Sequence, residues 1–490
     1  MRRASIALLL AASALAACTV GPNYHEPKLA TPAAFAEAQT AAPASEADLS
    51  TWWKSLGDPE LDTLIDRALA ANLDLQTAAS RVRQARRQVD AAAGAELPTL
   101  NATGAAVRLK RSGGSSSSQA AGGQATGGQA GAGAQAASGG LQIPSDLTFY
   151  SAGFDASWEL DLFGKTRRTV EAARDSLDAA VWQARDGQVS LTAELAGDYV
   201  QLRGLQARIA IARDELARQS QIRGVAADRA RFGFTTSLDV EQQNTQVAAT
   251  AAALPQLEAQ ARALVYGMAV LLGEQPETLS AELERAAAPP ASDPTLPAVG
   301  LPSDLLRRRP DVRMAERKLA AATAQVGVAV ADLYPQVNLM ALGSRGATSL
   351  GDLIPHGSNT AIGLAQITWP VFNAGRTRAQ IDIAREDRQQ AYLAYQKAVL
   401  AALADAETAI ARYRADQDRL NSLTEGVAAA QRAETLARQQ YGAGLSPFVN
   451  VLQTQGALLN ARDQLTSGQA QARKDLASLY KALGGGWRET

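Results

Sequence analysis

The clearest pattern of hydrophobic and polar residues is a strict alternation that ends just before a glycine. Between residues 153 and 162, apolar side chains such as Phe154 and Trp158 occupy every second position, and small or acidic residues such as Asp155 and Glu159 lie between them. Such a strand has one apolar and one polar face, which suits a soluble sheet as well as a membrane barrel with a wet interior. After Gly164 no proline occurs as far as residue 231. The pattern predicts a two-faced strand that leads directly into a long helix.

Apolar residues recur every seven residues along this predicted helix and along a second stretch after residue 375. The positions are Val181, Leu195, Leu202, Ile209 and Leu216 in the first stretch, with Gln188 as a polar exception, and Tyr392, Val399, Ala406, Tyr413, Leu420 and Val427 in the second. This spacing is that of a coiled-coil seam. A helix of about 66 residues is roughly 100 Å long, which is more than a compact domain requires.

The chain contains two copies of one pattern. Trp158 and Trp369 are 211 residues apart, and Gly164 and Gly375 have the same spacing. The tetrapeptide at 259–262 also recurs 211 residues later, at 470–473. Each copy predicts a helix, a strand, a loop, a second strand, a very long helix, a tight turn and a return helix.

The two repeats and the start of the chain together give the predicted domain boundaries, in which equatorial means midway along the long helices. They are a signal peptide at 1–17, an N-terminal anchor and equatorial segment at 18–57, a first repeat at 58–273, an equatorial linker at 274–303, a second repeat at 304–484 and a tail at 485–490. The first repeat is predicted to have a helix at about 59–93, strands at about 98–110 and 148–162, and helices at about 165–231 and 238–272. The second is predicted to have a helix at about 304–332, strands at about 335–345 and 359–372, and helices at about 375–441 and 447–483.

Two local features modify this scheme. Residues 112–140 are almost all Gly, Ser, Ala and Gln, which predicts an exposed loop that cannot bury a core. Pro255 lies inside a predicted return helix, where it should kink or break the helix.

Composition and charge narrow the classes of function. The 48 Lys and Arg residues nearly balance the 49 Asp and Glu residues, so no basic excess points to nucleic acid. The only cysteine, Cys18, excludes an internal disulfide and a cysteine metal cluster. His25 and His356 are isolated in the sequence, and no nucleophile–base pair is visible. We therefore expect no catalytic residue, no cofactor site and no metal site.

The start of the chain has the features of a bacterial lipoprotein signal. A short positive start precedes an apolar run from Ile6 to Leu15, which is too short for a spanning helix. The sequence Leu-Ala-Ala-Cys then ends at Cys18 and looks like a lipoprotein box, so Cys18 is predicted to carry a covalent lipid. An ordinary signal peptide with a chance cysteine is the alternative. Several acyl chains anchor a protein firmly in a membrane. An aspartate directly after the cysteine would suggest retention at the inner membrane, so the threonine at this position, Thr19, favours the outer membrane.

Four predicted strands per chain are too few to close a barrel. An open sheet has two unpaired edges, which lipid does not tolerate, and single-chain barrels begin at about eight strands. Strands that cross the membrane must therefore be shared by several chains. Two chains would give eight strands and a nearly filled interior, whereas three would give twelve strands with room for a passage.

Three long motifs occur in order along the chain. They are Trp158-Glu159-Leu160-Asp161-Leu162-Phe163-Gly164, the stretch at 305–313 followed by Ala315-Glu316-Arg317, and Trp369-Pro370-Val371-Phe372 with Gly375-Arg376. Together they resemble the TolC-type outer-membrane efflux proteins, and among these the NodT/OprM-like lipoprotein branch. The resemblance extends from Cys18 to about Gly484, nearly the whole mature chain.

This resemblance implies a fold class and a function. The fold would be mostly α with a small β part: a homotrimer forms a twelve-stranded outer-membrane β-barrel, continued by a long α-helical coiled-coil tunnel in the periplasm. Such a duct docks with a periplasmic adaptor (membrane fusion) protein and an inner-membrane pump of the RND type. It would conduct drugs, dyes, detergents or metal ions passively, without catalysis. Trp158, Gly164, Trp369 and Gly375 would form the barrel-to-tunnel junction.

The resemblance also implies that the two helix-to-helix turns form a gate at the periplasmic end. The predicted turn residues are Phe232, Gly233, Ser237, Gly444, Ser446 and Pro447, and the predicted gate residues are Asp239, Tyr441, Val449, Asn450 and Gln453. The residues themselves also favour turns at these two places. Glycine permits positive φ, and both Ser237 and the Ser446–Pro447 pair suit the start of a helix. Family members often have acids where this chain has Asn450 and Gln453, so constriction here would rest on Val449 and on hydrogen bonds.

Several alternatives remain open from the sequence. Asp239 either stabilises the start of its helix or joins a ring of acids at the pore, and Tyr441 either packs or bonds across its turn. The chain could instead be the duct of a type I protein or peptide secretion system, or a structural coiled-coil lipoprotein. An enzyme is the least favoured class, because helices rich in Ala and Gln supply no convergent reactive groups.

Overall fold

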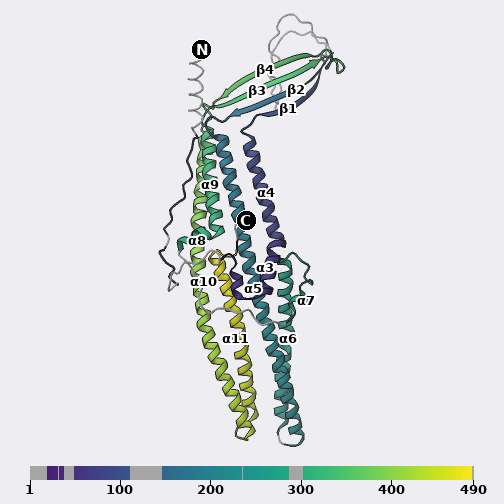
Figure 1. The fold of residues 1–490 in the computed structure, drawn as a ribbon, viewed down its shortest axis with the longest axis vertical. Coiled ribbons are helices and arrows are strands. Elements are labelled where there is room, and N and C mark those ends of the chain that lie inside the picture. The colour runs from purple at the N-terminus through teal and green to yellow at the C-terminus, as the bar shows by residue number, and fades with distance from the viewer. Residues whose placement is uncertain are drawn as a thin grey trace. The chain divides into compact units, whose positions relative to one another are not determined.

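The computed structural model describes residues 19–30, 32–37, 49–110, 146–233, 235–285 and 302–487. The predicted signal peptide, Cys18 and the loop 112–140 lie outside these ranges. The described chain forms long helices and one sheet (Figure 1). It divides into two compact units. One unit comprises the described parts of Met1–Pro22, Asp90–Val170 and Gln325–Asp382, and the other those of Asn23–Val89, Glu171–Ala324 and Ile383–Thr490.

The first unit contains a four-stranded antiparallel sheet. Its strands are β1 (Thr99–Lys110), β2 (Asp146–Leu160), β3 (Gln336–Ala347) and β4 (Ser358–Thr368), and they lie in the order β1-β2-β3-β4. The central pairing, between β2 and β3, joins the two repeats. The outer strands β1 and β4 each pair with one neighbour in the described chain, so the sheet has two open edges.

The register separates an apolar from a polar face near the base of the sheet. Trp158 lies opposite Leu339 and so shares a row with Ala365, whereas the next row contains Glu159, Asn338 and Gln366. The polar face is not uniform. Its β3 and β4 positions include four apolar residues, Met340, Leu342, Ile362 and Leu364, which lie beside the polar positions of β1 and β2.

Two strands end earlier than the alternation predicts. β2 ends at Leu160, because the chain bends there and the Leu162 N–H donates to the Leu160 carbonyl at 2.9 Å. β4 ends at Thr368 rather than near residue 372. The sequence reason is Pro370, which has no N–H to donate to a ladder.

The helices follow the predicted order in both repeats. They are the 3₁₀-helix η1 (Trp52–Leu56), α3 (Pro59–Ala71), α4 (Leu73–Gly94), α5 (Lys165–Arg231), α6 (Ser237–Leu271), α7 (Ser280–Leu283), α8 (Pro302–Arg308), α9 (Pro310–Ala331), α10 (Arg376–Gly442) and α11 (Phe448–Ala482). Helix α6 continues through Pro255, so of the two expected effects of this proline, a kink or a break, the break does not occur.

The helix predicted at 59–93 is in fact two helices, separated at Asn72. The Asn72 side-chain oxygen accepts a hydrogen bond from the Leu75 N–H at 2.9 Å, and its amide donates to the Leu271 carbonyl at 2.8 Å. This side chain therefore caps α4 and the end of α6 together. The helix predicted at 304–332 is likewise two, α8 and α9, because Pro310 disfavours helical backbone at Arg309.

The main hydrophobic core lies in the second unit. It gathers η1 and α3 against the middle of α5 and α10, and includes Trp52, Trp53, Leu195, Tyr199, Leu202, Val399, Ala406 and Tyr413. The Trp52 ring stacks on Tyr480 with centroids 5.0 Å apart. The predicted seam is thus buried at its centre, whereas Val181, Leu216, Leu420 and Val427 are only half-buried in the single chain.

Candidate functional site

The turn between α5 and α6 is closed by a capping box. Gly233 has a φ of +76°, which glycine adopts without strain. The Thr236 hydroxyl accepts from the Asp239 N–H at 3.4 Å, and the Asp239 carboxylate accepts from the Thr236 N–H at 3.4 Å and from the Thr235 hydroxyl. The N-cap is therefore Thr236 and not Ser237, which is the first helical residue. Asp239 acts as a local cap here.

The turn between α10 and α11 has a different cap. Gly444 has a φ of +73° and its N–H donates to the Tyr441 carbonyl at 3.0 Å. Helix α11 begins at Phe448, so Pro447 occupies the cap position that the sequence assigned to Ser446. The Ser446 hydroxyl instead accepts from the Asn450 side-chain amide at 2.9 Å.

Aromatic packing joins the two turns within the second unit. The Tyr441 ring lies 5.1 Å from the Phe448 ring, and the Arg229 guanidinium of α5 lies 5.6 Å from the Tyr441 centroid. Ile222 of α5 packs on the same small cluster. Tyr441 therefore packs in this structure. Of the other predicted gate residues, Val449 is half-buried, whereas Asn450 and Gln453 are exposed.

The two strand-to-helix junctions in the first unit repeat one another. The Trp158 indole N–H donates to the Glu96 carbonyl at 2.9 Å, and the Trp369 indole N–H donates to the Leu333 carbonyl at 3.0 Å. Each tryptophan thus ties the end of one strand to the segment that leads into its neighbour. Gly164 and Gly375 then turn the chain with φ values of +83° and +84°.

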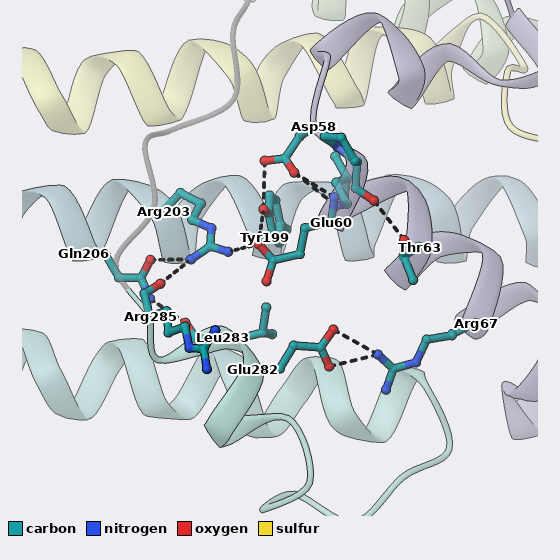
Figure 2. A network of polar contacts seen from close by, with 12 residues as sticks. Asp58, Glu60, Thr63, Arg67, Tyr199, Arg203, Gln206, Glu282, Leu283 and Arg285 are labelled. Atoms are coloured by element: carbon teal, nitrogen blue, oxygen red, sulfur yellow. Dashed lines mark hydrogen bonds and ion pairs between the residues drawn. The ribbon is translucent and has the colours of Figure 1, made fainter.

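A buried polar network lies beside the core of the second unit (Figure 2). The Arg203 guanidinium of α5 donates to the Glu60 carboxylate, to the Gln206 side-chain oxygen at 2.7 Å and to the Arg285 carbonyl at 2.9 Å. The Tyr199 hydroxyl donates to Asp58 at 2.8 Å. This network fastens the start of α3 and the segment after α7 to α5.

A second group of ion pairs joins α3 to the segment that follows α6. Arg67 of α3 donates to Glu282 at 2.9 Å (Figure 2). It also donates to Glu274 at 2.7 Å. Burial raises the pKa of the Tyr199 hydroxyl well above its ordinary value, so this group stays protonated and remains a donor. Sequence reasoning missed the network. The sequence contained one signal, because Arg203 and Arg414 are 211 residues apart and so occupy equivalent positions in the two repeats. In the structure Arg414 also donates to a backbone carbonyl, that of Glu37, at 2.6 Å.

Neither a metal cluster nor a membrane-crossing helix is found in the described ranges. No group of three or more His, Cys, Asp or Glu residues there could hold a metal ion. The helices described lack the combined length and apolar character that a bilayer crossing needs.

Comparison with known proteins decides the family. Residues 64–274 and 301–485 match the family described as outer membrane efflux protein. The chain belongs to this family. The outer membrane efflux protein described here is 34% identical over 494 residues to the pyoverdine export outer membrane protein OpmQ of Pseudomonas aeruginosa, a match that covers 100% of this chain and 98% of OpmQ.

Further similarities extend over the same length. The outer membrane efflux protein is 29% identical to nodulation protein T of Rhizobium leguminosarum bv. viciae, over 96% of this chain and 92% of that protein. The solved outer-membrane channel OprN matches with a TM-score of 0.84 at 33% identity, over 96% of this chain and 100% of that chain. The predicted relationship to TolC-type ducts, the mostly helical fold with a small β part and the outer-membrane location are therefore confirmed.

A carboxyl pair links the long helix of the second repeat of this outer membrane efflux protein to its return helix. Burial, a hydrogen bond to Asp475 of α11 and the charge of Asp475 raise the pKa of Asp416 of α10 to about 6, against the opposing charge of Arg419. Gln471 also donates to Asp475, at 2.9 Å. The folded protein thus favours the protonated form of Asp416.

This pair predicts a pH dependence of stability. The pKa of Asp416 is higher in the folded state than its ordinary value of 3.8, so its stabilising contribution is full below about pH 4 and is lost as the pH rises through about 6. We expect Asp416→Asn to raise the thermal unfolding midpoint at about pH 7.5, with a smaller gain at about pH 5. Circular dichroism at both values checks this, and parallel shifts at the two pH values would contradict it.

Proposed function

We propose that this outer membrane efflux protein is the passive exit duct of a tripartite efflux system. A periplasmic adaptor protein and an inner-membrane RND-type pump deliver drugs or other small toxic compounds to it, and it conducts them to the outside. The duct catalyses no reaction and needs no cofactor apart from the covalent lipid on Cys18. The relative OpmQ is named for the export of pyoverdine, a transport of the same direction.

The open four-stranded sheet carries this proposal. Its two outer strands, β1 and β4, each have one unpaired edge in the described chain, and unpaired backbone groups are not tolerated in lipid. Three copies of the chain satisfy every edge when β4 of one copy pairs with β1 of the next, which gives a barrel of twelve strands. The proposed assembly is therefore a homotrimer surrounded by outer-membrane lipid.

The two joined turns support the proposal of a gate. Tyr441 and Arg229 hold the α5–α6 and α10–α11 turns together, and Val449, Asn450 and Gln453 follow on the first turns of α11. In the proposed trimer these side chains, with Asp239, narrow the periplasmic entrance by bulk, by hydrogen bonds and by a ring of three carboxylates. Phe232, Gly233, Gly444, Ser446 and Pro447 shape the turns that present them.

Single-channel conductance of the lipidated trimer in planar bilayers tests the duct and its gate. The parent protein should form a low-conductance channel, and Asp239→Ala, Val449→Ala and Gln453→Ala should each raise the conductance, at least about twofold for the most effective. Ser478→Ala, an exposed position near the other end of α11, should leave it unchanged. Absence of any channel would contradict the duct, and no change in all three variants would contradict the gate alone.

A further inference from the structure

The first described residues of the chain are held in a built site in the first unit. The Val20 N–H donates to the Phe163 carbonyl at 3.1 Å. The Arg168 guanidinium donates to the Val20 carbonyl at 3.3 Å and to the Gly21 carbonyl at 3.5 Å. Arg168 is only 3% exposed, so these contacts are made by a buried charge that replaces its hydration shell with backbone oxygens.

Two glycines make room for this segment. A Cβ on Gly164 would lie 2.7 Å from the Thr19 methyl carbon, and one on Gly21, whose φ is +88°, would lie 2.5 Å from the Gly327 Cα. The segment Thr19–Gly21 therefore rests directly on the backbone of the junction and of α9. We call Gly164, Arg168 and Gly327 the N-terminal clamp.

The second repeat provides an internal comparison. Gly375 occupies the position of Gly164 and has nearly the same φ, and the Ala379 N–H donates to the Gly375 carbonyl at 3.0 Å as the Arg168 N–H donates to the Gly164 carbonyl at 2.8 Å. Yet the residue equivalent to Arg168 is Ala379, and nothing lies within 4 Å of a Cβ built on Gly375. The junction itself thus needs no arginine, and Arg168 is explained by the segment that it holds.

We infer that the N-terminal clamp is a binding site for the first residues of the mature chain and that Arg168 is its positioning residue. Thr19 follows the predicted lipid-bearing Cys18 directly, and one residue spans at most about 3.6 Å. The clamp therefore fixes the acyl chains beside the junction between β2 and α5, so that the lipid is held at one place on the protein. The binding site stands on the contacts above, whereas its anchoring role rests on the proposed lipid at Cys18.

Hydrogen exchange in the lipidated trimer tests the clamp. Arg168→Ala copies the second junction, so the start of α5 should keep its amide protection. Exchange in the N-terminal peptide that contains Val20 should become at least about tenfold faster, because Arg168 no longer holds this segment and the Val20 N–H separates more often from the Phe163 carbonyl. Arg167→Ala is the matched control, since the Arg167 side chain pairs with Asp161 and is more exposed. Mass spectrometry of the same peptide reports the lipid on Cys18.

The outcomes separate this inference from the proposed duct. Unchanged exchange in Arg168→Ala would overturn the clamp, whatever the channel conducts. If that variant does not fold, Gly327→Ala places a methyl group 2.9 Å from the Arg168 Cδ, which displaces the Arg168 side chain and should give the same faster exchange. Faster exchange with no lipid on Cys18 would keep the binding site and overturn the anchoring role. Loss of conductance in the parent protein bears on the duct alone.

Discussion

Replacing Arg203 with methionine should lower the free energy of unfolding by about 3 kcal/mol, because it removes a buried guanidinium and leaves the Glu60 carboxylate, which is 31% exposed, without its charge partner. Arg203 is 1% exposed, and its loss leaves the Arg285 carbonyl without this donor and the Glu60 carboxylate with the Tyr199 hydroxyl at 3.3 Å in place of a charged partner. The same change also removes the guanidinium that lies 4.8 Å from the Tyr199 ring. The thermal unfolding midpoint of the trimer, followed by circular dichroism, measures the effect.

The matched control lies on the same helix. Arg213 pairs with Glu258 across α5 and α6, but the Arg213 side chain is 64% exposed. Exposed pairs contribute at most about 1 kcal/mol, so Arg213→Met should shift the midpoint only slightly. Equal shifts in the two variants would mean that the network of Figure 2 contributes no more than a surface ion pair.

Gly486→Ala should destabilise the fold by about 3 kcal/mol, since it combines backbone strain with overpacking. Gly486 has a φ of +100°, and its N–H donates to the Leu49 carbonyl at 2.9 Å. A Cβ there would lie 2.4 Å from the Thr192 hydroxyl oxygen and 3.3 Å from the Trp52 indole nitrogen. Both neighbours are buried in the core and have no free space to enter.

Gly233→Ala separates the two contributions. Gly233 has a φ of +76°, and nothing lies within 4 Å of a Cβ built on it, so this variant should lose only the strain energy of about 1 kcal/mol. Urea unfolding of both variants compares the losses. A loss for Gly486→Ala no larger than that for Gly233→Ala would show that the C-terminal segment moves away from Thr192 without cost.

Local signals predicted most of the elements. The alternation before Gly164 and the proline-free stretch after it placed β2 and α5 to within two residues at each end, because strand and helix periodicity are written in consecutive residues. Pro310 was a visible stop signal for a helix, and the break at Arg309 could have been predicted from it. The break at Asn72 could not, since its side chain is held by the Leu271 carbonyl, which is 199 residues away.

The candidate site was predicted less completely. Helix-to-helix turns and strand-to-helix junctions lie where glycines and the 211-residue repeat mark them, and their roles in a gate and in a barrel stay predictions. The caps were each assigned one residue away from their position in the structure. Serine is the more usual cap residue, which favoured Ser237 over Thr236 and Ser446 over Pro447. The contact between Arg229 and Tyr441 joins different hairpins, and no spacing within one helix reveals such a contact.

By itself the sequence determined the two repeats, the four strands, the long helices and the family, since each depends on residues close together or on a motif repeated at a fixed interval. Only the tertiary structure decided which partner each of the two neighbouring arginines, Arg167 and Arg168, binds. Arg168 binds the N-terminal segment, whereas Arg167 beside it pairs with Asp161. The physical reason is that a buried charge is assigned its partners by the packing of distant segments, and no local pattern records that packing.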